Sequence, residues 1–138
     1  MENDPGKIPE GIRFTLKKGE RLCSKKQIEK LFAEGTSLLI YPLRMVYAET
    51  PLKGPFPAKV GFAVSRKYFK KAVTRNLIKR RMREAYRLNK YLLSSPQQQC
   101  SRAVMIIYVG KHALDFRAIE KAMKRSLSLI AKRVTPNP

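Results

Sequence analysis

Side chains that could cleave a substrate are scarce in this sequence. It has a single histidine, His112, and only ten aspartates and glutamates against 30 lysines and arginines. No two carboxylates lie three or four positions apart on an expected helix, and there is no Ser-His-Asp set, glycine-rich phosphate loop or Cys-x-x-Cys motif. We therefore predict no catalytic residue and no metal ligand in the chain, and we expect His112 to lie in a loop.

Cysteines and long apolar runs are scarce as well. Cys23 and Cys100 lie 77 positions apart and form no metal-binding pattern, which favours reduced thiols. The longest apolar run, Ala103 to Val109, has seven residues, whereas a membrane-spanning helix needs about 20. Residues 1–11 lack the apolar stretch of an export signal. These observations predict a cytoplasmic protein that does not cross a membrane.

What the sequence has in excess is positive charge. The formal net charge of the 138 residues is +20 at pH 7. Because 43% of the residues are hydrophobic, a folded core is expected beside this charge. The charge indicates a polyanionic partner, and nucleic acid is favoured over an anionic membrane surface.

The pattern of turn residues and apolar repeats predicts one domain at residues 14–133. A flexible tail is expected at residues 1–13 and a flexible end at residues 134–138. The expected elements are a helix from Ser24 to Gly35, a strand from Ser37 to Glu49 that bends near Pro42, a strand from Val60 to Ser65, a helix from Lys71 to Leu93, a strand from Ala103 to Val109 and a helix that Asp115 caps. The order α-β-β-α-β-α predicts an α+β fold, sandwich-like, with a single sheet of about four strands packed on helices.

Two features allow both a structural and a functional interpretation. The strand at residues 60–65 has one face of small residues, namely Gly61, Ala63 and Ser65, and Lys67 continues the alternation. A flat ligand could approach this face closely, or the face could simply pack under a helix. On the first helix, Ile28 and Phe32 lie one turn apart. Their pattern favours packing into the core, and stacking on unpaired bases is the alternative.

The most informative segment is residues 66–90, which contains eleven lysines and arginines and one acid, Glu84. On a helical wheel, one sector is basic and polar, with Arg75, Asn76, Lys79, Arg80, Arg83, Arg87 and Lys90. The opposite sector is apolar, with Val73, Leu77, Ile78, Met82, Ala85, Leu88 and Leu92. Like charges four positions apart repel one another, and no glutamate is expected within the basic sector. This uncompensated repulsion indicates a bound polyanion rather than a merely solvated face.

The same segment carries a family resemblance. The run from Ala72 to Arg80, AVTRNLIKR, is followed by Arg83-Glu84-Ala85 and preceded by Val60 to Lys67, VGFAVSRK. Together with Arg21-Leu22 and the helix that ends near Phe32 and Gly35, these motifs resemble the protein subunit of bacterial ribonuclease P. The resemblance covers about residues 19–133.

This resemblance implies a function within a ribonucleoprotein. In that family a catalytic RNA uses Mg²⁺ to cleave precursor tRNA, and the small protein binds both the catalytic RNA and the single-stranded 5′ leader. Mg²⁺ would be held mainly by RNA, the partners would be the catalytic RNA and precursor tRNA, and no membrane or further protein partner is required. The resemblance also implies a left-handed β-α-β crossover, as in a ribosomal-protein domain.

The resemblance also assigns the residues to two surfaces. On the basic helix, contacts with the catalytic RNA are expected from Arg75, Asn76, Lys79, Arg80 and Arg83, and Arg87 and Lys90 extend this face. A leader-binding cleft is expected to include Ile28, Phe32, Val46, Gly61, Ala63, Ser65, Arg66 and Lys67. The chain departs from the family pattern at Leu77, where a cation is lost, and at Ile28 and Val46, where the family has aromatics. Tyr47, next to Val46, would serve only with a one-residue shift that turns it to the other face.

Other functions share some of these features. A structural protein bound to ribosomal RNA would have the same charge but would need no site for a single strand. A DNA-binding module would place a short helix and a turn before the basic helix, whereas a strand is expected here. A nuclease that acts without RNA is disfavoured by the scarcity of carboxylates.

Overall fold

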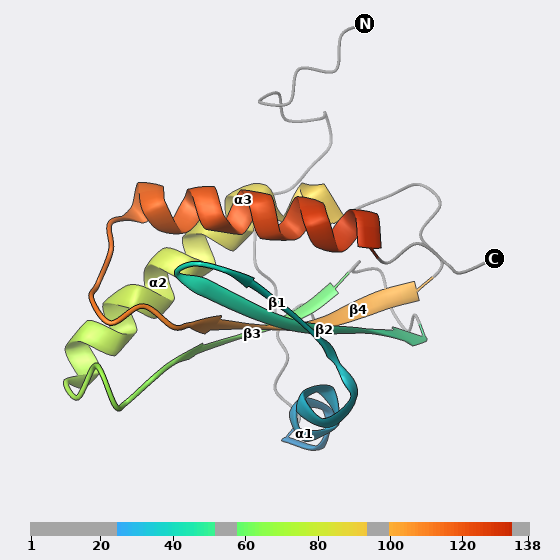
Figure 1. Cartoon of the computed structure of the whole chain (residues 1–138), viewed down its shortest axis with the longest axis horizontal. Coiled ribbons are helices and arrows are strands. Elements are labelled where there is room, and N and C mark those ends of the chain that lie inside the picture. Colours follow the sequence, from blue (N-terminus) through green and yellow to red (C-terminus); the bar gives the residue numbers. More distant parts are fainter. Residues whose placement is uncertain (1–24, 52–57, 94–99, 134–138) are drawn as a thin grey trace, which may run out of the picture.

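The computed structural model describes residues 25–51, 58–93 and 100–133. The elements, in chain order, are α1 (Lys25–Glu34), β1 (Thr36–Ile40), β2 (Leu43–Pro51), β3 (Ala58–Val64), α2 (Ala72–Asn89), the short 3-10 helix η2 (Lys90–Leu93), β4 (Cys100–Tyr108) and α3 (Phe116–Arg133). Helices α2 and α3 lie on one side of a single sheet and α1 lies on the other (Figure 1). The α+β fold with one sheet is therefore confirmed. The expected tail and end segments, Ser24 and Cys23 lie outside the described residues.

The sheet has the strand order β1-β2-β4-β3. The segment expected to be one bent strand is a hairpin of two antiparallel strands, β1 and β2, which turn at Tyr41 and Pro42. Strand β2 pairs antiparallel with β4, and β3 pairs parallel with β4. Because neighbouring parallel strands cannot be joined by a tight turn, α2 makes the crossover from β3 to β4. The left-handed sense of this crossover stays a prediction.

The main core lies between the sheet and the helices α2 and α3. Val60 of β3 and Ile106 of β4 project to this side, and Phe62 and Val64 pack against the same cluster. The alternation predicted for β3 is therefore confirmed. Helix α3 completes the core with Ile119, Ala122, Met123, Leu127 and Ile130, whose spacing places them on one face of the helix. The cap predicted at the start of α3 is present, since Asp115 Oδ1 accepts a hydrogen bond from the Ala118 amide at 3.0 Å.

The buried side of α2 differs from the predicted apolar sector. Val73 and Leu77, which were expected to be buried, are 80% and 38% exposed. Tyr86 and Asn89 are buried instead, together with Ile78, Met82 and Ala85. The Tyr86 ring packs edge-on against Phe62 at a centroid distance of 6.1 Å. Specific partners thus rotate the buried face toward two polar residues, and the prediction based on hydropathy alone was wrong at Val73 and Leu77.

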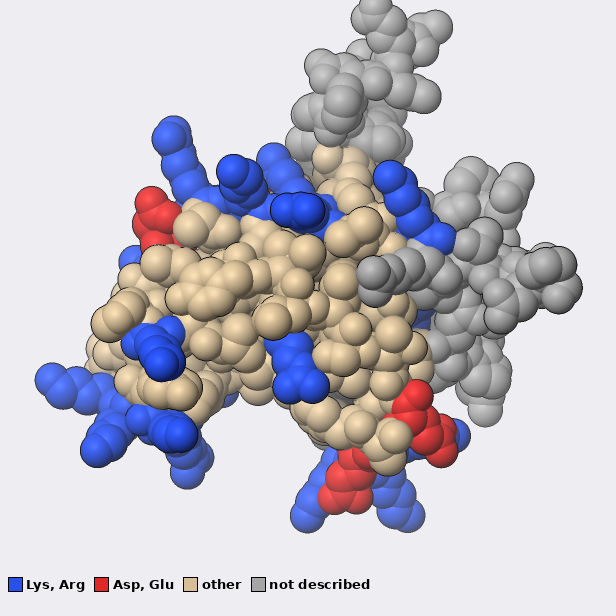
Figure 2. All heavy atoms as spheres, viewed as in Figure 1, with Lys and Arg blue, Asp and Glu red and all other residues tan. Residues whose placement is uncertain are grey.

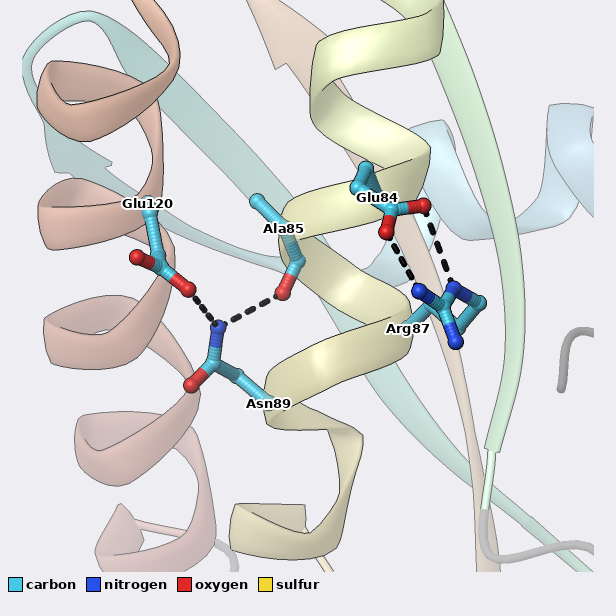
Figure 3. A network of polar contacts seen from close by, with 5 residues as sticks. All are labelled: Glu84, Ala85, Arg87, Asn89 and Glu120. Carbon is cyan, nitrogen blue, oxygen red and sulfur yellow. Dashed lines mark hydrogen bonds and ion pairs between the residues drawn. The ribbon is translucent and has the colours of Figure 1, made fainter. Parts of the chain in front are cut away.

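Buried Asn89 is tolerated because its amide has acceptors on two helices. Its Nδ2 donates to the Ala85 carbonyl at 2.8 Å and to Glu120 Oε2 at 3.2 Å, and Glu120 belongs to α3 (Figure 3). A buried amide without such partners would cost about 1–3 kcal/mol. The contact therefore links α2 to α3.

Helix α1 covers the other face of the sheet with a smaller cluster, formed by Leu31, Val46, Ala103 and Met105. The helix ends at Gly35, as predicted, where the backbone amide donates to the Leu31 carbonyl at 2.7 Å. A Cβ at Gly35 would lie 2.5 Å from that carbonyl oxygen and 2.9 Å from Val46 Cγ1. Only glycine therefore allows α1 to end this close to β2.

Candidate nucleic-acid interface

The basic residues of α2 differ in exposure. Asn76, Arg80 and Arg83 are exposed, while Lys79 is half-buried. Within the described part of the chain, no hydrogen bond or ion pair engages the charged groups of Lys79, Arg80 or Arg83. Positions 76, 80 and 83 are neighbours on one helical surface, so they present two guanidinium groups and an amide together. Such a group can bind adjacent phosphates and a ribose or base edge.

Arg75 departs from the role expected of it. It is half-buried, and its Nη1 donates to the carbonyl oxygens of Phe69 and Lys70, both at 2.8 Å. The guanidinium therefore links the first turn of α2 to the loop before it. This makes Arg75 a structural residue at the start of the basic face, and only the remaining donors of its guanidinium are left for RNA.

The far end of the basic face also differs from the prediction. Arg87 forms a two-point ion pair with Glu84, in which Nε lies 3.1 Å from Oε2 and Nη2 contacts Oε1 (Figure 3). This hydrogen bonding lowers the pKa of the Glu84 carboxyl and raises the pKa of Arg87. The expectation that no glutamate lies within the basic face was therefore wrong at this position. The face that is rich in uncompensated charge is centred on Lys79, Arg80 and Arg83.

The residues expected to bind a single strand divide into two groups. Gly61 and Ala63 lie opposite Met105 and Ile107 in the parallel register, on the face of the sheet that α1 partly covers. Val46 is on this face but is only 4% exposed under Leu31, so it supports α1 and offers no surface to RNA. Gly61 is buried as well. The prediction that Val46 and Gly61 line a binding surface was therefore wrong, because both residues are buried.

The aromatic member of the group remains accessible. Phe32 is 51% exposed and belongs to neither core cluster, so its interpretation as a core residue was wrong. Ile28 packs against the small cluster and is the more structural of the pair. Tyr47 lies in the main core on the opposite face, so it cannot replace Val46 at this surface.

The end of β3 adds charge to the same side. Arg66 and Lys67 are exposed, and Ser65 Oγ accepts a hydrogen bond from the Lys67 amide at 3.1 Å, which shapes the turn. The outline of the molecule is hollowed between α1 and the beginning of α2, and lysines and arginines project beside this hollow (Figure 2). An extended strand of nucleic acid could enter there.

The chain matches the ribonuclease P family model over residues 16–131. It belongs to the ribonuclease P protein family. It is 39% identical over 123 residues to the ribonuclease P protein component of Porphyromonas gingivalis, covering 88% of this chain and 90% of that protein. It is also 39% identical over 93 residues to the ribonuclease P protein component of Chlorobaculum tepidum, covering 65% of this chain and 60% of that protein. The resemblance inferred from the α2 motif is thereby confirmed.

Solved structures of ribonuclease P proteins share the fold. The protein from Thermotoga maritima superposes with a TM-score of 0.65 at 25% identity, over 80% of this chain and 96% of that one. The protein from Staphylococcus aureus gives a TM-score of 0.65 at 19% identity, over 80% and 94% of the two chains, and supports the fold alone. No helix within residues 25–51, 58–93 and 100–133 is long and apolar enough to span a membrane.

Several basic residues of this family member were not found from the sequence. Arg44 is exposed on β2 and donates from Nε to Ser37 Oγ at 3.0 Å. Arg44 and Val46 are two positions apart on one strand and therefore share a face of the sheet. This spacing could have placed Arg44 on the α1 side. Helix α3 carries a second exposed basic face with Arg117, Lys121, Lys124, Arg125 and Lys132 (Figure 2). These basic residues alternate with the apolar residues of α3 at helical spacing, and this pattern in the sequence would have predicted the exposed basic face.

Proposed function

We propose that this chain is the protein subunit of a ribonucleoprotein ribonuclease P. It binds the catalytic RNA and the 5′ leader of precursor tRNA and assists Mg²⁺-dependent removal of the leader, which leaves the mature 5′ end. The observation that carries this proposal is the row of uncompensated cations on α2, Lys79, Arg80 and Arg83, in a member of this family. Each charge that meets a phosphate releases counterions, which supplies affinity for RNA.

The two surfaces have different chemistry, and we assign them different partners. The cation row of α2 offers guanidinium and ammonium groups but little exposed aromatic surface, which suits the backbone of the folded catalytic RNA. The α1 side offers the exposed ring of Phe32, and the loop after β3 offers the exposed cations Arg66 and Lys67. We assign both to a single strand, whose unstacked bases and phosphates match these groups. A protein that only supported ribosomal RNA would have no use for the second surface.

The described residues carry few groups that could bind Mg²⁺. Mg²⁺ is bound through carboxylates and water, and the described residues contain no cluster of three or more His, Cys, Asp and Glu side chains that could hold a metal. We propose that the RNA holds the ion, as the resemblance to the family implies. The protein contributes phosphate neutralisation and positioning of the substrate.

The decisive experiment is cleavage of precursor tRNA by the cognate catalytic RNA at low Mg²⁺, with and without the protein. We expect the wild-type protein to restore cleavage, and the double variant Arg80→Gln/Arg83→Gln to require a much higher protein concentration. Removing each charge-assisted hydrogen bond to RNA should weaken assembly by about 1–3 kcal/mol. The slope of log K against log salt should become shallower by about 0.7–0.9 for each phosphate that is no longer neutralised.

The matched control removes two arginines from α3 instead, as Arg117→Gln/Arg125→Gln. It makes the same change in net charge at a surface to which this proposal gives no role. If both double variants weaken assembly equally, the binding reflects net charge alone and the assignment to α2 is wrong. If the wild-type protein does not change cleavage at any concentration, the proposed function is wrong.

A further inference from the structure

An exposed tyrosine lies between two lysines at the end of the molecule where α2 and α3 begin. Tyr68 is 43% exposed in the loop between β3 and α2. Lys67 Nζ lies 5.6 Å from the centre of its ring, and Lys111 Nζ, from the loop between β4 and α3, lies 5.8 Å from it. The two loops are distant in sequence, but both follow the parallel strands β3 and β4 and therefore meet at the same edge of the sheet (Figure 1).

Buried contacts hold these two loops in place. Phe69, the neighbour of Tyr68, packs edge-on against the Tyr108 ring at a centroid distance of 5.8 Å. The Tyr108 hydroxyl donates to the His112 carbonyl at 2.6 Å and accepts from the Leu114 amide at 2.9 Å. The loop that carries Lys111 is thus tied to the end of β4, and Phe69 ties the loop of Tyr68 to the same ring.

Two arginines of α2 donate hydrogen bonds to backbone carbonyls of these loops. Arg75 donates to the Phe69 carbonyl, and Arg81 Nη1 donates to the Leu114 carbonyl at 2.6 Å. The ring of Tyr68 is therefore presented to solvent by backbone that is fixed on both sides. A preorganised aromatic loses little conformational freedom when a ligand stacks on it.

A purely structural role does not account for this arrangement. A cation–π contact at an exposed site is worth only about 0.5–1 kcal/mol, and the ring contact between Phe69 and Tyr108 already joins the two loops. An aromatic ring with cations beside it is instead the usual means of binding an unpaired nucleotide, whose base stacks on the ring while its phosphates meet the cations. Both lysines are exposed, so an arriving base can displace an ammonium group from the ring toward a phosphate.

We propose that Tyr68, Lys67 and Lys111 form a nucleotide-binding site for single-stranded RNA. The site lies between the charged end of β3, with Arg66, and the start of the cation row on α2. One base would stack on the Tyr68 ring, and the adjacent phosphates would meet Lys67 and Lys111. The inference rests on the proposed function because the bound strand is taken to be RNA of the same complex.

The absence of tryptophan from the sequence allows a direct test. Tyr68→Trp introduces a single tryptophan, and its fluorescence should be strongly quenched when the full chain binds a single-stranded decauridine RNA. Tyr91→Trp, in η2 beyond the far end of α2, is the control and should be quenched far less. Equal quenching at both positions, or none at position 68 at RNA concentrations that saturate binding, would overturn the proposal.

A second measurement separates stacking from hydrogen bonding and from folding. Tyr68→Leu should weaken binding of the decauridine by about 5- to 150-fold, the range expected when one base no longer stacks. Tyr68→Phe retains the ring and should bind within about twofold of the wild type, and both variants should melt close to the wild-type temperature. If Tyr68→Leu binds as tightly as the wild type, or if Tyr68→Phe weakens binding just as much, base stacking at Tyr68 is refuted.

The lysines and the wider function are distinguished by two further variants. Lys67→Met and Lys111→Met should each make the salt slope shallower by about 0.7. Arg80→Gln/Arg83→Gln should weaken binding to the catalytic RNA whatever happens at position 68. If Arg80→Gln/Arg83→Gln weakens binding of the catalytic RNA but Tyr68→Leu leaves binding of the decauridine unchanged, only the nucleotide site is refuted. If Arg80→Gln/Arg83→Gln leaves binding of the catalytic RNA unchanged, the proposed function is refuted.

Discussion

The two faces of the sheet differ in the size and burial of the side-chain clusters that cover them. On the face under α2 and α3, large side chains from every strand and both helices form a closed core in which Tyr86, Ile106 and Met123 are fully buried. On the face under α1, the cluster is small and relies on residues such as Ala103 and Ala63, and Phe32 remains half exposed beside it. The larger buried core therefore lies on one face, and the other face has the less buried surface to which we assign the single strand.

The difference extends to the loops and helices at the edges of the sheet. Phe69 fills the main core beneath the loop before α2, whereas its neighbour Tyr68 is exposed. Arg75 and Arg80 are likewise close in sequence, but one binds backbone carbonyls and the other has no partner among the described residues. Such neighbouring pairs provide matched variants that test the comparison directly.

The largest contrast is expected between two phenylalanines. Phe69→Ala should lower the free energy of unfolding by about 3–5 kcal/mol because it opens a cavity in the main core. Phe32→Ala should change stability by less than about 1 kcal/mol but should weaken binding of leader-bearing RNA by about 1–3 kcal/mol, because a base can no longer stack on the ring. Thermal melting and binding of precursor tRNA with and without its leader measure the two effects. If Phe32→Ala melts as early as Phe69→Ala, the α1 face is a second core and not a binding surface.

Adjacent isoleucines of β4 test the two faces within one strand. Ile106 is fully buried on the helix side, and Ile107 is partly buried on the α1 side. Ile106→Ala should cost about 2–5 kcal/mol, because the tight core cannot relax into the cavity. Ile107→Ala should cost about 1 kcal/mol, in proportion to the smaller area that it buries. Urea unfolding of both variants measures the difference, and equal costs would contradict the assignment of the larger buried core to one face.

On α2, the contrast between the inner and outer surface is expected to be smaller. Arg75→Met should lower the free energy of unfolding by about 1–3 kcal/mol, because two carbonyls of the preceding loop lose a charged donor. Arg80→Met should leave stability within about 0.5 kcal/mol and act only on RNA binding. Chemical denaturation without RNA is the measurement. A destabilisation of the same size for Arg80→Met would show that it has a structural partner as well.

The smallest expected effect is the pH dependence of the ion pair between Glu84 and Arg87. Hydrogen bonding to Arg87 lowers the pKa of Glu84 below its ordinary value of 4.5, so the pair stabilises the fold above that pH. The stabilisation is lost as the pH falls through the lowered pKa. Both side chains are partly exposed, which limits the contribution to about 0.5 kcal/mol.

Glu84→Gln tests this pair by the difference in unfolding free energy from the wild type. The difference should be present at pH 7 and should vanish once the pH is well below the lowered pKa of Glu84. A difference that is the same at both extremes of pH would mean that the carboxylate charge is not involved.

Much of this fold was predictable because its signals are local. Asp115 caps α3 and Gly35 ends α1 as their residue types suggest, since a cap needs only a side-chain acceptor close in sequence and a helix end needs only a missing Cβ. The alternation in β3 assigned Val60 and Ala63 to opposite faces for the same reason. Family membership also followed from a short run of residues on α2.

Other properties depend on which segments meet across the fold, and no local pattern carries that information. The rotation of α2 is set by Phe62 and Glu120, which contact Tyr86 and Asn89 from another strand and another helix. The composition of the chain establishes a strongly basic protein and indicates a polyanionic partner. Only tertiary packing decides that α1 buries Val46 and leaves Phe32 exposed, that Arg75 donates to carbonyls, and that Lys111 comes to lie beside Tyr68, because burial and charge compensation are properties of contacts between distant residues.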